Sequence, residues 1–211
     1  TTEIYTLSLH DALPILEHGG AMKDYSLGDQ YFSAFFQSVT LRTAGFNSIP
    51  FGSLRDATYM IMILFMFIGA ASGSTAGGIK IGSLAVILSS LRAFMRGEKT
   101  PTLRNTSIPF ERVSRAYLIL LFGIGAVFLG TLVLTLTESA PFLHLLFETV
   151  SAFGTVGLSA GVTGTLSPPG KLVIIMLMFF GRLGPLTILS AAGTSTETAA
   201  VSYPQCDIAI G

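Results

Sequence analysis

Residues 147–161 read FETVSAFGTVGLSAG, and this stretch decides how the rest of the chain is interpreted. It lies between two strongly apolar segments, which places it at the depth of a membrane. Its glycines at 154, 157 and 161 and the β-branched pair Thr155 and Val156 are poor helix formers. Lipid cannot satisfy the hydrogen-bonding groups of irregular backbone, so such a stretch needs another partner at that depth.

The composition is that of an integral membrane protein. Of the 211 residues, 50% are hydrophobic and 11% are charged, and the mean hydropathy is +0.68, whereas soluble domains carry roughly 25% charged residues. The net charge is zero, which gives no basic balance for a nucleic-acid partner. The single Cys206 forms no internal disulfide, and no Cys or His spacing suits a metal. These totals place the chain in the membrane class and exclude redox and zinc sites.

Apolar runs predict where the chain crosses the membrane. Residues 116–136 form one clean span, and residues 171–192 form another that contains Arg182 and Pro185. The segment 54–97 has about 44 residues and would be roughly 66 Å long as one straight helix, twice the hydrocarbon thickness. It must therefore break, and the small-residue cluster at 72–78 predicts the position of the break.

Basic residues predict the orientation of these spans. The loop between the spans carries a cluster of them: Arg92, Arg96, Lys99, Arg104, Arg112 and Arg115. The positive-inside rule makes this loop cytoplasmic. The connections 17–53 and 138–170 then lie outside, and the tail 193–211 is cytoplasmic.

Two of the outer connections resemble each other. FFQSVTLRTAGFNS (35–48) and LFETVSAFGTVGLS (146–159) share one pattern at a period of about 111 residues, and such repeats commonly place a transport site where they meet. Each begins with an apolar run of helical spacing, 31–40 or 142–152, that is too short to span and predicts a re-entrant half-helix. A Thr-x-Gly-apolar stretch follows in both copies.

These two stretches are candidate ion-binding sites, formed by Thr43, Ala44, Gly45 and Phe46 and by Thr155, Val156, Gly157 and Leu158. Glycine permits backbone angles that other residues resist, so consecutive carbonyls can point into a common axis. A ring of such carbonyls replaces the water around K⁺, and the partly negative C-terminal end of a half-helix favours a cation there. The alternative is a pair of glycine-containing outer turns.

Several motifs in the same order resemble the Trk/Ktr/HKT superfamily of K⁺ transporters. They are QSVTLRTAGFNS, GAASGSTAGGIK (69–80), FETVSAFGTVGLS and FFGRLGPLT, and the YPQCDIAIG ending is similar to the tail of the Ktr membrane subunit. The likeness covers residues 16–211. It implies an all-α integral membrane fold of repeated units, each a transmembrane helix, a re-entrant pore helix, a filter loop and a second transmembrane helix. Four units form a chain of that family, and the third and fourth resemble this sequence.

The resemblance also divides the chain. Residues 16–97 correspond to the third pore repeat without its first membrane helix, 98–112 to a cytoplasmic linker, 113–192 to the fourth repeat and 193–211 to a cytoplasmic tail. Residues 1–15, TTEIYTLSLHDALPI, resemble a translated sequencing adapter, and we expect them to be an artefact; the alternative is a short amphipathic segment. We therefore expect a truncated chain that is inactive alone.

In the family, the segment matching 69–80 is an intramembrane loop that gates the pore beneath the filter. This implies gate roles for Gly73, Ser74, Thr75, Gly77, Gly78 and Lys80. A phosphate-binding loop is excluded, because Ile79 follows Gly78 where that motif needs lysine; a small-residue helix-packing face is the alternative. For Lys80 itself, the cytoplasmic interface is the alternative position.

Three further charged residues are singled out. Intramembrane charge usually faces a protein or water-filled interior, and the family places the residue matching Arg182 near the gate. We expect Arg182 to be a cation barrier that also holds the gate loop. Glu148 either braces the filter through hydrogen bonds or faces the outer water. Arg42, beside the first filter stretch, is expected at the outer mouth.

The resemblance implies channel-like K⁺ uptake across the bacterial inner (plasma) membrane, by a transporter that is not an enzyme and has no catalytic residues. Both K⁺ alone and K⁺ with Na⁺ as a coupling or activating ion are compatible with the sequence. The expected partners are membrane lipid, a second copy in a homodimer, and a cytoplasmic nucleotide-binding regulatory subunit at residues 92–112 and the tail. Two alternatives stay open: a secondary transporter whose broken helices bind another substrate, and a non-conducting membrane assembly subunit.

Overall fold

The computed structural model describes residues 13, 15–17, 20–71, 74, 76–98, 100–103 and 106–184, and every structural statement concerns these residues. The helices are α2 (Leu27–Thr40), α3 (Asp56–Phe67), α4 (Ile81–Met95), α5 (Phe110–Thr137), α6 (Phe142–Gly154) and α7 (Pro168–Leu183). Two 3₁₀ turns (Phe51–Ser53 and Thr163–Thr165) and a small hairpin of β1 (Thr102–Leu103) and β2 (Thr106–Ser107) complete it. The expected all-α architecture is confirmed.

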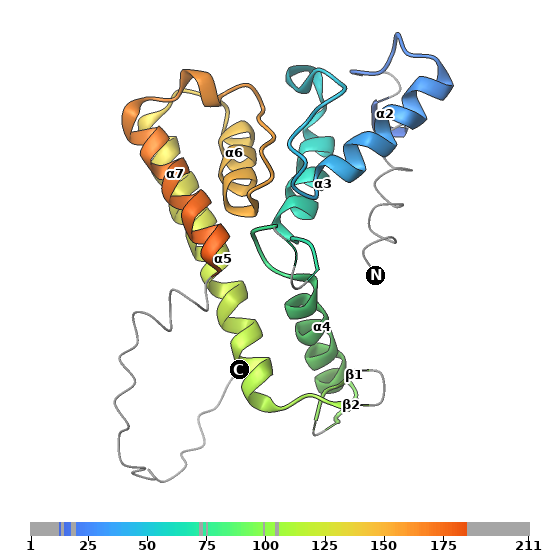
Figure 1. Cartoon of the computed structure of the whole chain (residues 1–211), viewed down its shortest axis with the longest axis vertical. Coiled ribbons are helices and arrows are strands. Elements are labelled where there is room, and N and C mark those ends of the chain that lie inside the picture. The colour runs from blue at the N-terminus through green and yellow to red at the C-terminus, as the bar shows by residue number, and fades with distance from the viewer. Residues whose placement is uncertain are drawn as a thin grey trace.

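The helices are arranged along one long axis (Figure 1). Helix α5 runs along much of this axis with α7 beside it, while α3 and α4 follow one another on the other side. The short α6 lies in the upper half and packs against α3, α5 and α7. Among the described residues, α5 is the one helix long and apolar enough to cross a membrane by itself. It contains the whole of the predicted span 116–136.

Helix α7 differs in its extent from the predicted span 171–192. It begins earlier, at Pro168, because the Ser167 side chain caps it by accepting a hydrogen bond from the Gly170 N–H. It ends at Leu183, followed by Gly184 with a φ of 79°. Arg182 therefore lies in the last turn of α7. Residues 185–192, including Pro185, lie outside the described residues.

The predicted break in the long apolar segment is confirmed and starts earlier than expected. Helix α3 ends at Phe67 and α4 begins at Ile81, so residues 68–80 separate them. Ile68 and Ile79 form a parallel bridge, in which the Gly69 N–H donates to the Ile79 carbonyl at 2.8 Å. Backbone hydrogen bonds across the break thus hold the facing ends of the two helices together.

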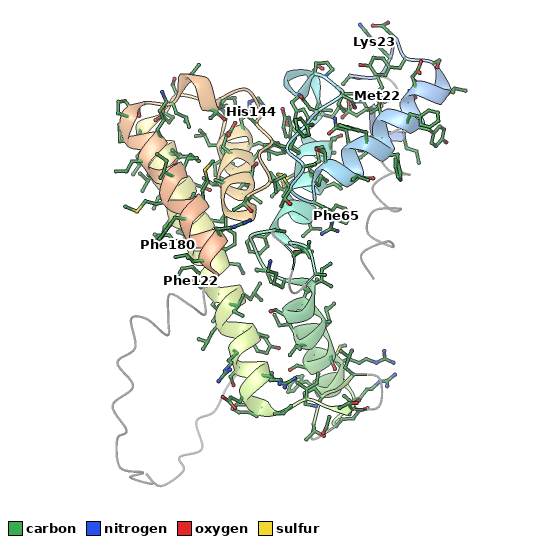
Figure 2. All side chains as sticks on the ribbon, viewed as in Figure 1. Met22, Lys23, Phe65, Phe122, His144 and Phe180 are labelled. Atoms are coloured by element: carbon green, nitrogen blue, oxygen red, sulfur yellow. The ribbon has the colours of Figure 1, made fainter. Side chains whose placement is uncertain are left out.

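Both predicted half-helices are present as α2 and α6. Helix α6 forms the centre of the core, with Phe147 and Phe153 fully buried. The Phe147 ring meets the Tyr59 ring edge-on at 5.2 Å, and the Phe153 ring stacks on Phe67 at 6.1 Å. Figure 2 shows His144 at the upper end of α6, where its ring lies 5.1 Å from that of Tyr59. The second filter stretch therefore starts from a tightly packed helix.

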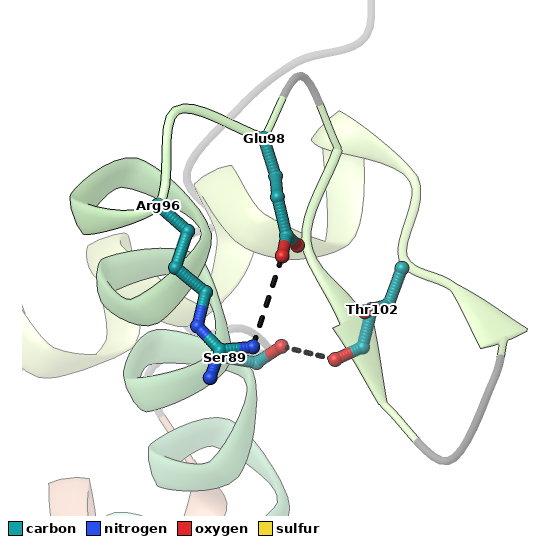
Figure 3. Close-up of polar contacts among 4 residues, drawn as sticks. All are labelled: Ser89, Arg96, Glu98 and Thr102. Atoms are coloured by element: carbon teal, nitrogen blue, oxygen red, sulfur yellow. Dashed lines mark hydrogen bonds and ion pairs between the residues drawn. The ribbon is translucent and has the colours of Figure 1, made fainter.

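The basic loop at the lower end folds against α4 (Figure 3). The Ser89 hydroxyl on α4 donates to the Thr102 carbonyl of β1 at 2.7 Å, and Arg96 pairs with Glu98 at 3.9 Å. An exposed ion pair of this kind contributes about 0–1 kcal/mol, so it adds little to stability. Of the six basic residues expected in this loop, Lys99 and Arg104 lie outside the described residues.

Candidate selectivity filter and gate

Each half-helix is followed by the same unusual backbone form. Positive φ values recur at alternate positions in both copies, at Thr43 (75°), Gly45 (74°), Thr155 (52°) and Gly157 (89°). A β-branched residue with positive φ is a genuine outlier in proteins, so its presence at both threonines is specific to this motif. The sequence repeat is therefore also a repeat of backbone conformation.

Most carbonyls of the two stretches are available to a cation. Within the described part of the chain, no hydrogen bond is accepted by the first three carbonyls of either copy, which belong to Thr43, Ala44 and Gly45 and to Thr155, Val156 and Gly157. In this chain Val156 is buried, whereas Ala44 and Gly157 are exposed. A carbonyl that accepts no hydrogen bond is open to coordinate an ion. The C-terminal end of α6, at Gly154, lies directly before the second set and adds its partial negative charge.

The fourth carbonyl of each copy accepts a hydrogen bond from its own half-helix. The Thr40 hydroxyl donates to the Phe46 carbonyl at 2.5 Å, and the Ser151 hydroxyl donates to the Leu158 carbonyl at 2.6 Å. Thr40 and Ser151 occupy the same position in the repeat. These hydroxyls tie the end of each stretch back to its own half-helix. A carbonyl oxygen has two lone pairs, so Phe46 and Leu158 stay expected ion ligands.

The two stretches lie side by side. A Cβ added at Gly45 would lie 3.0 Å from the Val156 carbonyl oxygen, and one added at Gly157 would lie 3.3 Å from the Gly45 Cα. Neither position has room for a side chain without displacing the other copy. Glycine is thus required here both by its φ and by the close approach of two backbones.

Glu148 braces the second copy, which resolves the two alternatives that its sequence position left open. Its side chain is buried, and its carboxylate accepts hydrogen bonds from the Ser159 hydroxyl, from the Ala160 N–H at 3.1 Å and from the Thr163 hydroxyl at 2.8 Å. In the first copy Gln37 takes this place, and its amide donates to the Ser48 hydroxyl at 3.4 Å. Both copies thus use a buried polar side chain to hold the segment after the filter.

We expect Glu148→Leu to lower the thermal stability and the K⁺/Na⁺ discrimination of a complete transporter that carries this chain. The change removes three hydrogen bonds and leaves the buried Ala160 N–H without a partner, which costs about 1–3 kcal/mol. Glu148→Gln keeps one acceptor oxygen and should have a smaller effect. The melting temperature of the purified protein and the ratio of K⁺ to Na⁺ uptake measure the two effects.

Glu111→Gln is the matched control for this prediction. Glu111 is an exposed glutamate on α5 whose partner is the equally accessible Arg115, so its loss should change neither measurement. If Glu148→Leu behaved like Glu111→Gln, the bracing role would be wrong.

Two further glutamates tie the outer ends of the repeats together, and sequence reasoning missed them. The fully buried Glu17 accepts from the Arg55 N–H at 2.9 Å and from the Thr58 hydroxyl at the start of α3. Glu138, just after α5, accepts from the Ser167 N–H at 3.2 Å and from its hydroxyl at the start of α7. A carboxylate is favourable at a helix N-terminus, and each one here accepts from the N-cap residue of the helix that follows a filter stretch.

The tie at Glu138 depends on pH. Hydrogen bonds from Ser167 lower the pKa of Glu138 below the ordinary carboxyl value. The group therefore contributes stability that is fully present above the ordinary pKa and is lost as the pH falls through the lowered one. At neutral pH the tie is intact.

The segment between α3 and α4 lies directly beneath the second filter stretch. The Gly77 N–H donates to the Thr155 hydroxyl at 2.9 Å, and a Cβ at Gly77 would lie 2.9 Å from the Phe153 carbonyl oxygen. Gly78 has a φ of 71°. Ser74 is described, whereas the other two predicted gate residues, Gly73 and Thr75, lie outside the described residues. The predicted gate is thus in direct contact with the predicted filter.

Two cations lie at this level. The Lys80 ammonium folds back onto the segment and donates to the carbonyls of Ala76 and, at 3.3 Å, Ser74. Arg182 lines a partly polar cavity of 390 Å³ together with Thr155 and Gly157. It lies close enough to Lys80 for their charges to repel. Arg182 therefore lies beside the second filter stretch, and Lys80 lies on the segment beneath it.

Arg42 lies elsewhere than we predicted. Its guanidinium donates to the carbonyls of Ile68 at 2.8 Å and Gly69 at 3.3 Å, where α3 has just ended. The expected position at the outer mouth is therefore wrong. The turn after α2 directs this side chain toward the break, where open carbonyls accept its hydrogen bonds.

Comparison with known proteins agrees with this geometry. The sequence profile of the TrkH family, described as a cation transport protein, matches residues 2–201. This chain belongs to the TrkH family. The family is one of membrane cation transporters and not of enzymes, which confirms the resemblance to Trk and Ktr proteins. The match includes nearly all of residues 1–15, whose artefactual origin stays a prediction.

Named relatives of this chain also belong to cation transport systems. Ktr system potassium uptake protein B from Bacillus subtilis is 44% identical over 93% of this chain and 44% of its own length. The protein of that name from Vibrio alginolyticus is 38% identical, and potassium/sodium uptake protein NtpJ from Enterococcus hirae is 36% identical. The chain spans less than half of the length of each of these relatives.

A solved structure shares the fold. The potassium transporter TrkH from Vibrio parahaemolyticus superimposes with a TM-score of 0.74, covering 90% of this chain and 43% of that protein, at 22% sequence identity. The arrangement of half-helices and broken helices is thus that of a TrkH-family transporter.

Proposed function

We propose that this chain supplies two of the repeats that line a channel-like K⁺ uptake pore. The observation that carries the proposal is the pair of left-handed Thr-x-Gly stretches that meet side by side with six carbonyls available. Carbonyl oxygens replace the hydration shell of K⁺ in selectivity filters. The names of the Ktr relatives support K⁺ as the transported ion, and that of NtpJ supports a role for Na⁺ as well.

We further propose that residues 68–80 form the gate. The segment lies against the end of α6 and the Thr155 hydroxyl, and Gly77 and Gly78 allow backbone angles that a displacement of this contact would need. Lys80 and Arg182 place positive charge below the filter, which opposes cation passage until they move. Gly73 and Thr75 complete this segment by sequence.

The remaining expectations are also proposals. We infer that the transporter is a homodimer in the plasma membrane, with lipid around its apolar faces. Its cytoplasmic nucleotide-binding regulatory subunit would contact the basic loop around Arg92, Arg96 and Arg112, which folds on the far end of α4 from the filter. The positive-inside rule places this loop and the tail 193–211 in the cytoplasm.

The proposed function is tested with a complete transporter, in which this chain replaces the matching region of the Bacillus subtilis relative. This complete chimera should restore the growth of a K⁺-uptake-deficient bacterium at low external K⁺. Failure to do so, with the protein present in the membrane, would overturn the proposal and favour a non-conducting assembly subunit. Uptake of an organic substrate driven by Na⁺ would instead favour a secondary transporter.

The gate proposal predicts that Arg182→Ala raises K⁺ uptake by the complete chimera. One unit charge close to an ion in a hydrated cavity contributes about 1 kcal/mol, so we expect an increase of about fivefold. Initial rates of K⁺ or Rb⁺ uptake provide the measurement.

Two variants control this prediction. Arg182→Lys keeps the charge and should transport at the unchanged rate. Arg115→Ala removes an exposed arginine at the cytoplasmic end of α5 and should also leave the rate unchanged. Equal rates for Arg182→Ala and Arg182→Lys would show that the charge is no barrier.

A further inference from the structure

The end of α3 lies between the two filter copies and is held by both. From the first copy, the Arg42 guanidinium donates to the Ile68 and Gly69 carbonyls at 2.8 and 3.3 Å. From the second, Gly154 approaches so closely that an added Cβ would lie 2.8 Å from the Met66 carbonyl oxygen. A shift of the α3 end would therefore be felt by both copies.

Arg42 is suited to this position by its chemistry. The last carbonyls of a helix have no intrahelical partner, and at membrane depth no water replaces the missing donors. Guanidinium carries several N–H donors in a rigid planar fork and stays charged, so one side chain satisfies two carbonyls at the point where the backbone leaves α3. The positive charge also complements the negative end of the helix dipole.

The backbone of Arg42 belongs to the filter. It directly precedes Thr43, whose φ of 75° opens the first filter stretch, and it follows Leu41, the C-cap of α2. A displacement of its guanidinium thus acts on a strained residue only one peptide bond away. Thr155, at the matching position of the second copy, accepts the Gly77 N–H at 2.9 Å further along the same segment. The segment is attached to the filter at its start and near its end.

We propose that Arg42 is a positioning residue that couples the filter to the gate, so that the ion content of the filter and the position of residues 68–80 depend on each other. The inference rests on the proposed function of these two elements. The second copy has Gly154 where the first has Arg42, so the arginine tie exists in one of the two copies only. Binding of K⁺ that fixes Thr43 also fixes Arg42, and through it the start of the gate segment.

The test uses a reporter on the gate. In the complete chimera, Cys206 and the other cysteines are first replaced by serine. Ala76→Cys is then introduced as the single reporter thiol. Ala76 is 5% exposed, so its thiol reacts with a charged methanethiosulfonate only when the segment moves. The rate at which the reagent modifies this thiol is measured in inverted vesicles. One sample contains K⁺, and the other contains an impermeant organic cation in its place. Coupling between sites typically changes an equilibrium by about fivefold or more. Because K⁺ in the filter fixes the segment, we expect the modification rate in the organic cation to exceed the rate in K⁺ by a ratio of that size.

Substitutions at position 42 decide the outcome. Arg42→Gln and Arg42→Ala should bring the rate ratio close to one, and Arg42→Lys, which keeps the charge but not the planar fork, should give an intermediate ratio. Arg55→Gln is the control, since Arg55 is an exposed arginine at the N-cap of α3 and should keep the full ratio.

Several results would overturn the proposal. A ratio near one in the chimera that retains Arg42 would mean that no coupling exists, and an undiminished ratio in Arg42→Gln would mean that Arg42 does not carry it. Failure of all three variants to reach the membrane would assign Arg42 to folding alone. Each is distinct from failure of the proposed function, because growth at low K⁺ is measured separately on the chimera that retains Arg42.

Discussion

Gly157→Asp is expected to abolish the discrimination between K⁺ and Na⁺ in the complete chimera. Gly157 has a φ of 89°, and a Cβ there would lie 3.3 Å from the Gly45 Cα of the other copy. The substitution therefore strains the backbone, forces the two stretches apart and adds a carboxylate that competes with the carbonyls for cations. The ratio of K⁺ to Na⁺ uptake should fall by about tenfold or more, which corresponds to a loss of about 1.4 kcal/mol of discrimination.

The same argument applies to Gly45→Asp, because a Cβ at Gly45 would lie 3.0 Å from the Val156 carbonyl oxygen. The two effects should not add, since either substitution separates the same pair of stretches.

Alanine separates the two physical causes. Left-handed backbone costs about 1–2 kcal/mol for a residue with a Cβ, and Gly157→Ala and Gly161→Ala share this strain because Gly161 has a φ of 91°. Only Gly157 faces the other copy, whereas a Cβ at Gly161 would meet nothing within 4 Å. Loss of selectivity in Gly157→Ala but not in Gly161→Ala is expected. Unchanged selectivity in Gly157→Asp would remove these carbonyls from the ion path.

Gly181→Val is expected to have the largest effect on stability. A Cβ at this position of α7 would overlap the Phe153 carbonyl oxygen and lie 2.7 Å from its carbonyl carbon. Backbone cannot rotate away as a flexible side chain can, so α7 must withdraw from the end of α6. Overpacking of this kind costs about 1–3 kcal/mol and occasionally more. The melting temperature of the purified complete chimera should fall clearly in Gly181→Val. In Gly181→Ala the melting temperature should fall by less.

Gly125→Ala is the matched control in a second membrane helix. A Cβ at Gly125 on α5 would meet nothing within 4 Å, and alanine is favoured over glycine in helices by about 1 kcal/mol. This variant should be as stable as the parent or more stable. A melting temperature of Gly181→Val equal to that of Gly125→Ala would contradict the contact between α7 and α6.

The two half-helices and the break between α3 and α4 were predictable because they follow from local properties of the sequence. An apolar run of about ten residues is too short to span a bilayer wherever it occurs, and a cluster of glycine and serine interrupts a helix without help from distant residues. The left-handed backbone at Gly45 and Gly157 was signalled by the residue type itself. The prediction for α7 ran past its end at Leu183, because the apolar residues beyond Gly184 and Pro185 outweighed the stop signal that these two residues give.

By itself, the sequence thus determined the re-entrant elements and the repeat of the filter stretches, since hydrophobic length and glycine spacing are read along the chain. Only the tertiary structure decided where the charged side chains go. The hydrogen-bond partner of Glu17 is Arg55, 38 residues along the chain. The partner of Arg42 is Ile68, at a separation of 26 residues. A charge withdrawn from water must be paired with whatever donors or acceptors the fold brings near it, and at the end of α3 these are open carbonyls. That requirement places Arg42 between filter and gate, a position that its neighbours in sequence did not reveal.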